Sequence, residues 1–317
     1  MNNKTRPSLS VILCNYNHSH YLEECLSAIL HQSYQAFEII IIDDGSTDNS
    51  LQILSNLAAQ NPVIQLIRHS ENKGVIFSAN EGFHLATGDY VYSAGADDKI
   101  LPGFFEKSME MLAQYPKAGL CCSDPVTFDG DTNIFADNRQ GVSEACYLSP
   151  EEIVVRMKRR FFWIAGHTSL MRRTVFLEAG TLIPELRWHC DWFALHVIAF
   201  RYGICYVPGK LATLRVHSTT YSKKPRPWLE RQQVYRLLFE TIISEKYRDT
   251  LPFFKRSGIL STFFYFAFIT TFSSPRFYRF LNWPFLEAII RSVIKAVLKR
   301  IPGAQRLYHF LKQREAS

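Results

Sequence analysis

Two apolar strand patterns that each end in paired acidic residues constrain this chain more than any other feature. The run 39–42 leads into Asp43-Asp44, and the run 90–94 is followed within a few residues by Asp97-Asp98. In open α/β folds, ligands bind at the edge formed by the carboxyl ends of the strands. Four carboxylates at one edge repel one another unless a cation or polar ligand lies among them. The pattern therefore predicts a metal-assisted site that handles phosphate.

Strands and helices are expected to alternate through the first 119 residues. Strand patterns over 9–13, 38–42, 64–68 and 90–94 alternate with apolar residues at helical spacing, and Pro102 is expected to open a further helix. This order requires a mainly parallel sheet with right-handed crossovers, an α/β fold. From about Leu120 the pattern loosens, which predicts shorter strands and loops that bind a second substrate.

Composition narrows the class of protein. A chain of 317 residues with 47% apolar residues can form one large domain, or a domain with an appendage. The seven cysteines lack paired CxxC spacing and the ten histidines are scattered, so we expect a reduced protein without a zinc site. The polar start, 1–7, has no apolar leader and predicts a cytoplasmic location.

The ordered motifs resemble the inverting glycosyltransferases of family 2, which have the GT-A fold. The matching segments are 10–17, 37–48, 72–74, 80–82, 86–91, 96–102, 190–192 and 214–218, and their order and spacing agree over residues 8 to about 222. The resemblance implies a Rossmann-like GT-A domain over 1–222, with a nucleotide-binding half over 1–119 and an acceptor half over 120–222. Residues 223–317 then form a helical, basic and aromatic C-terminal region.

The resemblance also implies donor-binding residues. Tyr16 lies where the family stacks the nucleotide base, and Asp44 where a carboxylate accepts a base N–H. In the alternative interpretation, Tyr16 packs in the core and the paired acids only cap a helix. The full set expected to bind the nucleotide or donor is Cys14, Tyr16, Asp43, Asp44, Lys73 and Asp97.

Asp97 and Asp98 resemble the family's Asp-x-Asp metal motif, in which oxygen ligands hold Mg²⁺ or Mn²⁺ against the donor's phosphates. Here Gly95 stands in place of the first acid, which makes Asp98 the expected direct ligand. His217, in the family's Arg-x-His segment, is the second expected metal ligand. The alternatives are that the two acids are exposed loop charges and that His217 only makes a structural hydrogen bond.

Asp191 is the expected general base. Inversion needs one carboxylate that removes the acceptor's proton while the anomeric carbon is attacked from the opposite face. Asp191 also precedes an apolar helical stretch, so a role at a helix start is compatible. The residues expected to contact the acceptor are His167, Trp188, His189 and Trp192, although a packed turn explains His167 equally well.

The C-terminal tail carries the whole charge excess. Residues 255–317 contain 11 basic and 2 acidic residues, whereas the other 254 residues contain 25 basic and 27 acidic. The pattern over 285–300 predicts an amphipathic helix with Arg291, Lys295 and Lys299 on a basic stripe, and an apolar stretch of 15 residues precedes it. An anionic membrane surface is the expected partner and nucleic acid is not; packing on the body or a homo-oligomer contact is the alternative.

These expectations converge on a metal-dependent, inverting transfer of a sugar from a UDP- or dTDP-linked donor. The tail indicates a lipid-linked saccharide acceptor on the inner face of the cell membrane, and the resemblance implies surface polysaccharide biosynthesis. Two alternatives remain, namely a catalytically silent sugar-nucleotide-binding or scaffold protein and a sugar nucleotidyltransferase. The nucleotidyltransferases usually carry a glycine-rich, basic loop after the first strand, which segment 14–17 does not supply.

Overall fold

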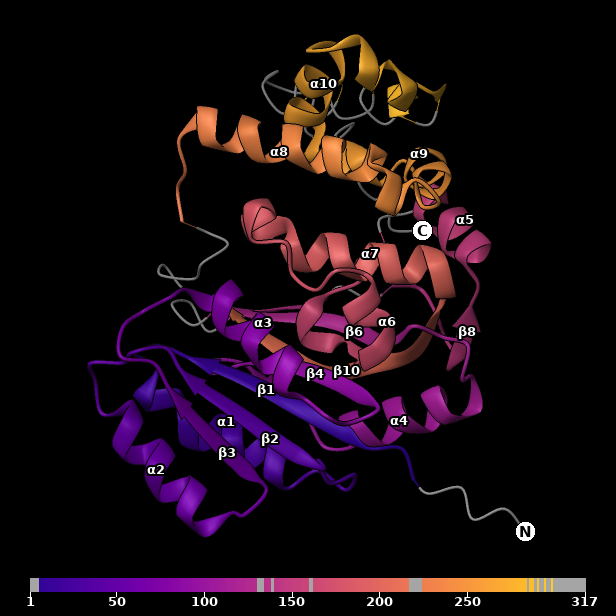
Figure 1. Ribbon diagram of the computed structural model, residues 1–317. Helices are drawn as coiled ribbons and strands as arrows, with labels where there is room; N and C mark the ends of the chain where they lie inside the picture. Colours follow the sequence, from indigo (N-terminus) through magenta and orange to yellow (C-terminus); the bar gives the residue numbers. More distant parts are fainter. Residues whose placement is uncertain are drawn as a thin grey trace. The chain divides into compact units, whose positions relative to one another are not determined.

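The computed structural model describes residues 6–129, 134–137, 140–159, 162–216, 224–283, 285–287, 290, 294 and 298. Two compact units are present (Figure 1). The N-terminal unit comprises residues up to 148 together with 163–224. The C-terminal unit comprises 149–162 and the chain from 225 onward. The sequence did not indicate that segment 149–162 belongs with the C-terminal helices.

The N-terminal unit begins with alternating strands and helices, as predicted. Its first half consists of β1 (Leu9–Asn15), α1 (Ser19–Leu30), β2 (Glu38–Asp43), α2 (Ser50–Gln60), β3 (Ile64–Arg68), α3 (Val75–Leu85), β4 (Tyr90–Gly95), β5 (Lys99–Ile100) and α4 (Phe104–Gln114). Pro102 lies outside α4, so the prediction that it opens this helix was wrong. Gly103 precedes the helix with a φ of 82°, a left-handed conformation that glycine adopts without steric cost.

The second half adds strands, short 3₁₀ turns and helices. These are β6 (Leu120–Asp129), β7 (Ile134–Asp137), β8 (Cys146–Leu148), η1 (Gly166–Thr168), β9 (Leu170–Arg172), α6 (Arg173–Glu178), η2 (Pro184–His189), α7 (Cys190–Tyr202) and β10 (Ile204–Val216). The expectation of shorter strands after Leu120 is confirmed for β7, β8 and β9 but was wrong for β6, which has 10 residues, and β10, which has 13. Pro125 in β6 and Pro208-Gly209 in β10 interrupt the apolar pattern that would have revealed these strands.

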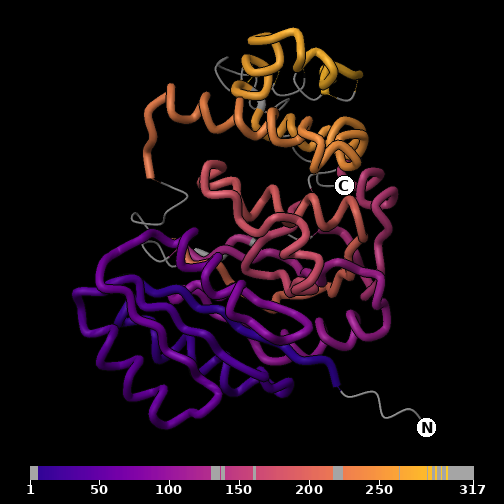
Figure 2. The backbone as a smooth tube through the Cα atoms, in the orientation of Figure 1, coloured from indigo at the N-terminus to yellow at the C-terminus, as the bar shows by residue number. Residues whose placement is uncertain are grey.

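One ten-stranded sheet joins these strands in the order β3-β2-β1-β4-β9-β6-β10-β5, with β7 beside β6 and β8 beside β10. Pairing is parallel from β3 to β4 and between β6 and β10, whereas β9 runs antiparallel to both β4 and β6. The α/β architecture with flanking helices is confirmed, but its sheet is mixed. The chain path in Figure 2 shows the early strands, in indigo, gathered at one end of the sheet.

Helices cover both faces of this sheet. Within the unit, α1, α2 and α4 lie on one face and α3, α6 and α7 on the other (Figure 1). Leu9, Val11 and Leu13 of β1 pack with apolar residues of α1 and α4 in one fully buried cluster. The alternate residue, Ile12, faces α3, where a Cβ at Gly82 would lie 2.4 Å from its side chain. The parallel register sets Asn15 opposite Asp43 and Cys14 opposite Gly95, so these strands end at one edge.

The C-terminal unit is helical, which confirms the predicted helical C-terminal region. Its elements are α5 (Pro150–Arg159), α8 (Trp228–Ile243), η4 (Glu245–Tyr247), α9 (Leu251–Ser257), η5 (Ile259–Phe263), α10 (Phe264–Phe272) and η6 (Pro275–Phe280). Aromatic rings from α8, α10 and η6 form its core. Tyr235 stacks on Phe266 with 4.8 Å between ring centroids, and Phe239 lies 4.5 Å from Phe280. Arg256 of α9 pairs with Glu151 of α5.

No helix among the described residues is long and apolar enough to span a membrane. The predicted basic stripe, Arg291, Lys295 and Lys299, lies outside the described residues.

Gly45 generates a stability prediction, because the turn after β2 passes very close to the 71–72 segment. A Cβ at Gly45 would lie 2.6 Å from the carbonyl carbon of Glu71, and the φ of Gly45 is +73°. Gly45→Ala should therefore lower the free energy of unfolding by about 2–4 kcal/mol in urea titrations.

Gly74→Ala is the matched control for this substitution. Gly74 has a φ of +94°, but a Cβ there would meet nothing within 4 Å. This variant should lose less, about 1–3 kcal/mol, which is the cost of the backbone conformation alone. Equal losses in the two variants would show that close packing at Gly45 contributes nothing.

Candidate active site

The loop after β1 is locked to the turn after β2. Asn15 donates from Nδ2 to Asp43 at 2.9 Å and to Ser46 Oγ at 3.1 Å. Asn17, whose φ of 57° is one that asparagine tolerates, accepts the amide of Thr47 at 2.8 Å. Tyr16 lies between these two anchors and is 43% exposed, so it is not the core residue of the alternative interpretation. The fold therefore holds the ring of Tyr16 at the sheet edge.

Asp43 is buried and supports the turn. Besides the amide of Asn15, its carboxylate accepts the backbone N–H of Ser46 at 3.2 Å. Asp48, five residues later, accepts the amides of Ser19 and Ser50 at the starts of α1 and α2. Burial would raise the pKa of Asp48, but hydrogen bonds from Ser50 and Ser19 hold it at about 2. Thus Asp48, rather than the paired acids, accepts the backbone N–H groups at the starts of α1 and α2.

Asp44 is the buried end of a hydrogen-bonded series in which the His69 imidazole lies between two acids. Its Oδ1 lies 2.7 Å from His69 Nδ1, and His69 Nε2 lies 2.7 Å from Glu81 of α3. The amides of Lys73 and Gly74 donate to Asp44 at 2.9 and 2.8 Å. Burial would raise the pKa of Asp44, but these hydrogen bonds hold it below its ordinary value. The hydrogen bonds from Lys73 and Gly74 to Asp44 fix the 72–74 segment beside the end of β2.

His69 carries the charge that joins the two acids. Burial alone would lower its pKa, but hydrogen bonds with Asp44 and Glu81 raise it above the ordinary histidine value. A cationic imidazole between two carboxylates satisfies both ring nitrogens and offsets the desolvation of Asp44.

Two further residues of the predicted nucleotide set, Cys14 and Lys73, differ in chemical state. Cys14 of β1 is half-buried, and burial with the nearby Asp44 raises the pKa of its thiol to about 12, so it stays protonated. Lys73 is exposed, and its Nζ lies 4.9 Å from the centroid of the Phe77 ring.

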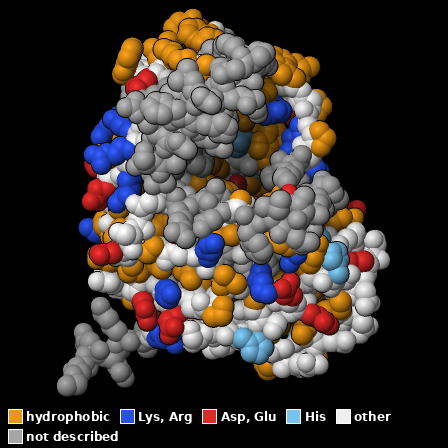
Figure 3. Space-filling view, turned by 180° about the vertical axis from the view of Figure 1, so that it is seen from behind, with side chains coloured by type: hydrophobic (Ala, Val, Ile, Leu, Met, Phe, Trp, Pro, Cys, Tyr) orange, Lys and Arg blue, Asp and Glu red, His pale blue; other side chains and the backbone are white. Residues whose placement is uncertain are grey.

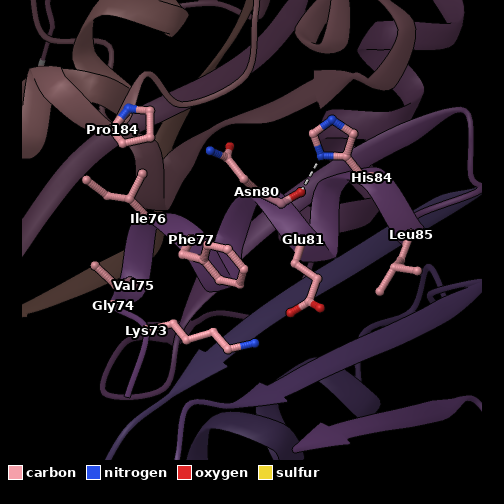
Figure 4. A pocket seen from close by; sticks show the side chains of 10 residues that line it. All are labelled: Lys73, Gly74, Val75, Ile76, Phe77, Asn80, Glu81, His84, Leu85 and Pro184. Carbon is pink, nitrogen blue, oxygen red and sulfur yellow. Dashed lines mark hydrogen bonds between the residues drawn. The ribbon is translucent and has the colours of Figure 1, made fainter. Parts of the chain in front are cut away.

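A pocket of about 740 Å³ lies against α3 (Figure 4). Among the predicted site residues only Lys73 borders it, so this pocket is not the predicted centre of chemistry. Glu81, on its wall, connects it to Asp44 through His69. The lining residues are Lys73, Gly74, Val75, Ile76, Phe77, Asn80, Glu81, His84, Leu85 and Pro184.

Asp97 and Asp98 converge beside Gly95, directly after β4. A Cβ at Gly95 would lie 2.8 Å from Asp98 Oδ2 and 3.1 Å from Asp97 Oδ1. The residue that departs from the Asp-x-Asp pattern therefore makes room for the two following acids. Burial first, and the neighbouring Asp97 second, raise the pKa of Asp98 well above its ordinary value.

Arg215 of β10 clamps this acidic turn. Its backbone N–H donates to Asp98 Oδ1 at 2.9 Å, and its Nε donates to the carbonyl of Asp97 at 3.0 Å. The same guanidinium reaches Glu24 of α1 at 3.2 Å, and Lys99 pairs with Glu24 at 2.7 Å. The Arg215 guanidinium also lies 4.6 Å from the centroid of the Tyr21 ring. Its charge lowers the pKa of Asp98 against the two larger effects.

The donor set beside Gly95 suits a cation shared with a substrate. No group of three or more histidine, cysteine or acidic side chains gathers as a metal site within the part of the chain that the structure describes. Mg²⁺ and Mn²⁺ sites of this type often use one or two carboxylates and complete the shell with water and substrate phosphates. Asp97 and Asp98 match that arrangement. His217, the second predicted ligand, lies outside the described residues.

Asp191 lies in the first turn of α7 and contacts η1. Its Oδ1 accepts its neighbour Trp192's amide at 2.7 Å, and its Oδ2 would lie 3.2 Å from a Cβ at Gly166. The side chain is accessible to solvent, yet the surrounding protein displaces enough water to raise its pKa. A carboxylate with a raised pKa at a helix start is suited to accepting a proton.

His167 is buried beside Asp191's neighbour Gly166. Its carbonyl accepts the hydroxyl of Tyr92 from β4 at 3.0 Å, which ties η1 to the strand that precedes Asp97. Burial lowers the pKa of His167 to about 4, and its Nε2 has no hydrogen-bond partner among the described residues. The ring is therefore neutral, and Trp163 meets it edge-on with 6.0 Å between centroids.

The three other predicted acceptor residues form an aromatic series. Trp188 donates from its indole N–H to His189 Nε2 at 2.9 Å, and the rings of His189 and Trp192 lie 6.3 Å apart. Arg187, immediately before them, has φ 49° and ψ −119°, a strained backbone that turns η2 toward α7. Such strain is commonly found where a functional segment must be held in one position.

Two groups of predicted residues are thus assembled. Tyr16, Asp43, Asp44 and the 72–74 segment meet at the ends of β1 and β2, with Asp97 and Asp98 at the end of the adjacent β4. Asp191, His167, Trp188, His189 and Trp192 surround the junction of η1 and α7. The hydrogen bond from Tyr92 to His167 connects the second group to β4.

Comparison with solved structures shows the same fold. The structure resembles the Staphylococcus aureus protein TarS (residues 1–349) in complex with UDP-GlcNAc, with a TM-score of 0.63, covering 97% of this chain and 88% of that one at 16% identity. The complex of the same protein with UDP gives a TM-score of 0.62 at 18% identity. The fold is therefore that of the GT-A glycosyltransferases.

The sequence comparison gives the family. Residues 10–180 match the model of glycosyl transferase family 2, and this chain belongs to that family. An uncharacterized glycosyltransferase of Nostoc sp. PCC 7120 is 29% identical over 214 residues, which are 66% of this chain and 65% of the relative. The uncharacterized glycosyltransferase YibD of Escherichia coli K12 is 40% identical over 106 residues, 33% of this chain and 30% of the relative. The chain thus spans less than two thirds of these relatives.

Sequence reasoning missed three supporting residues. His69 follows β3 in a segment without periodicity, so its position between Asp44 and Glu81 had no local signal. Arg215 was noticed only as part of the Arg-x-His segment, and Glu24 was not singled out. Their contacts depend on pairing between β10 and β5, which no motif in the sequence indicates.

Arg215 generates a titration prediction. Removing its charge should leave Asp98 with burial and Asp97 as its dominant neighbours, and both raise the Asp98 pKa. In the metal-free protein, Arg215→Gln should therefore shift the Asp98 titration to higher pH, as measured by ¹³C NMR of labelled aspartate carboxyls. Lys99→Gln is the control, since it removes a cation that pairs with Glu24 but not with Asp98. An unchanged Asp98 titration in Arg215→Gln would show that the charge of Arg215 does not lower the pKa of Asp98.

Proposed function

We propose that this chain is a metal-dependent, inverting glycosyltransferase that moves a sugar from a UDP- or dTDP-linked donor to a saccharide acceptor. Membership of family 2 supports glycosyl transfer, and the TarS structures in complex with UDP-GlcNAc and UDP support a nucleotide-sugar donor. The observation that carries the proposal is the pairing of two acidic centres through β4. Asp97 and Asp98 follow that strand, and Asp191 contacts η1, which Tyr92 holds to the same strand.

The nucleotide would bind at the ends of β1 and β2. Tyr16 offers an exposed ring on which a pyrimidine can stack. Asp44 already accepts three hydrogen bonds, and a carboxylate can accept about four, which leaves capacity for one base N–H. Lys73 is exposed on the segment that Asp44 anchors, within reach of an anionic ligand.

The diphosphate would lie beside Gly95. When bound, Mg²⁺ or Mn²⁺ supplies positive charge that neutralises the leaving diphosphate. Asp97 and Asp98 would hold that ion, and Arg215 holds the turn through the Asp98 carboxylate and the Asp97 backbone carbonyl. Without a cation, two acids this close favour protonation of Asp98, as its raised pKa indicates.

Asp191 would act as the general base. Its Oδ2 is free of the helix-start hydrogen bond that Oδ1 accepts, so Oδ2 can take the proton of an acceptor hydroxyl. The Trp188, His189 and Trp192 rings would form a platform for the acceptor sugar and limit the access of water, which would otherwise hydrolyse the donor. His167, neutral and buried, would keep Gly166 in contact with Asp191.

The acceptor is proposed to be lipid-linked, which would place the protein on the inner face of the cell membrane in surface polysaccharide assembly. Two features support this proposal. After residue 254 the sequence contains 11 basic and 2 acidic residues. The C-terminal unit is also rich in aromatic residues.

Asp191→Asn provides the test of the base. The amide cannot accept the proton, so transfer should fall by about 10²–10⁴-fold while UDP affinity stays unchanged. The raised pKa of Asp191 also predicts that kcat/KM falls, as pH decreases, at a pH above the ordinary aspartate value.

Glu185→Gln is the control for this experiment, because Glu185 is an exposed acid on η2 that contributes nothing to the proposed chemistry. Donors can be screened by product NMR, which also reports inversion at the anomeric carbon. Near-normal turnover in Asp191→Asn would move the base elsewhere, and nucleotide binding without any transfer would favour a silent sugar-nucleotide-binding protein.

A further inference from the structure

Helix α10 buries two threonines and exposes two phenylalanines. Its side chains Thr270 and Thr271 are 1% and 0% exposed, whereas Phe268 and Phe272 are 42% and 48% exposed. Thr271 satisfies its hydroxyl by donating to the carbonyl of Ala267 at 2.8 Å. A surface helix of a water-soluble unit normally turns its aromatic residues inward. Another environment must therefore stabilise the outer face of α10.

The exposed rings continue from α10 onto η6. Phe268 and Phe272 lie 4.8 Å apart by ring centroids, and Phe272 lies 6.2 Å from Tyr278 of η6. Tyr265 is 54% exposed and Tyr278 48%. We call this surface the aromatic face; its residues are Tyr265, Phe268, Phe272 and Tyr278. In Figure 3, hydrophobic side chains gather on this part of the C-terminal unit, toward the top of the view.

The aromatic face is not left over from a unit that lacks a core. Phe266 on the opposite side of α10 is 7% exposed and stacks on Tyr235 of α8. In η6, Phe277 and Phe280 are 0% and 1% exposed against Phe239. Because the inner positions are already filled with aromatic residues, the outer ones are additional apolar surface. Clustered exposure of this kind marks an interaction site.

Charge identifies the occupant. From Thr250 to Leu286 the sequence contains four basic residues and no acidic one. Arg276 and Arg279 are exposed on η6, and the Arg276 guanidinium lies 4.8 Å from the centroid of the Phe277 ring. Arg276 already pairs with Glu240 of α8, whereas Arg279 meets no carboxylate among the described residues. An aromatic surface bordered by cations fits the interface of an anionic lipid bilayer.

We propose that the aromatic face docks the protein on an anionic membrane surface, with Phe268 and Phe272 inserted among the lipids and Arg279 at the level of the headgroups. Tyr265 and Tyr278 carry hydroxyls that suit this boundary between apolar and aqueous surroundings. Only the purpose of docking, which is to bring the site to a lipid-linked acceptor, rests on the proposed function. The surface itself is defined by the side chains of α10 and η6.

Co-sedimentation of the full chain with vesicles tests this assignment. Vesicles of phosphatidylglycerol and phosphatidylcholine should bind the protein, and vesicles of phosphatidylcholine alone should bind it much more weakly. The double variant Phe268→Ser, Phe272→Ser should lower the partition coefficient by about tenfold or more. Arg279→Glu should lower it by about fivefold or more, and high salt should abolish that difference.

Matched controls lie in the N-terminal unit. Phe37→Ser replaces an aromatic residue that is 61% exposed, and Lys107→Glu reverses an exposed charge on α4. Both controls should bind vesicles as the unmodified chain does. Circular dichroism verifies folding, and if the double serine variant does not fold, Tyr265→Ser and Arg279→Glu decide the outcome.

Two results would overturn the proposal. One is vesicle binding that is absent in the unmodified chain or unchanged in the face variants. The other is that the unmodified chain forms a dimer in analytical ultracentrifugation, that Phe272→Ser is a monomer, and that vesicles bind neither protein. In that case the aromatic face is a contact between two copies of the chain. Transfer to a short soluble acceptor is measured in parallel and should be unaffected by the face variants. If the unmodified chain binds vesicles but shows no transfer, the proposed function is refuted and the docking proposal is not.

Discussion

The crowding of carboxylates at one edge of the sheet is the constraint on which the rest of the structure depends. Asp43 ends β2 and Asp44 follows it, whereas Asp97 and Asp98 follow β4, and both strands flank β1. Each charge must be compensated or protonated, because buried or adjacent carboxylates are otherwise costly. The fold answers with Asn15 and the Ser46 amide at Asp43, with His69 and two amides at Asp44, and with Arg215 at the β4 turn.

The compensation differs between the two acid pairs, and the difference suggests a division of roles. Asp43 and Asp44 are held by neighbours within the protein, and the hydrogen bonds lower the pKa of Asp44. They shape the loops around Tyr16 before any ligand binds. Asp98 is compensated incompletely, since burial and Asp97 raise its pKa despite Arg215. A cationic ligand would complete this second pair, which is why we propose that a metal-bound diphosphate binds at the β4 turn.

Much of the nucleotide half could be predicted from the sequence. Strands β1 to β4 are short apolar runs in strict alternation with helices, and the acids that end them meet because parallel strands end together. The later half could not be predicted in the same way. Strand β9 has three residues and enters the sheet between β4 and β6, which no local pattern signals. The exposure of Phe268 and Phe272 on α10 was also hidden, because composition alone does not tell which residues of a helix face the core.

The site followed the same rule. Residues inside ordered motifs, such as Tyr16 and Asp191, could be proposed as site residues from the sequence, and their side chains are accessible in the structure. Residues that act by holding others were not, since His69 and Arg215 gain their meaning only from contacts between distant segments. The strained backbone of Arg187 belongs to this second group.

Calorimetric titration of the full chain with UDP and dTDP, with and without Mn²⁺, tests the central claim most directly. The account predicts that the cation tightens binding of the diphosphate, that Asp98→Asn removes this dependence on the cation, and that Tyr16→Ala weakens binding whether or not Mn²⁺ is present. It would be contradicted by nucleotide affinity that is identical with and without Mn²⁺ in the unmodified chain, or by the absence of nucleotide binding in a folded protein.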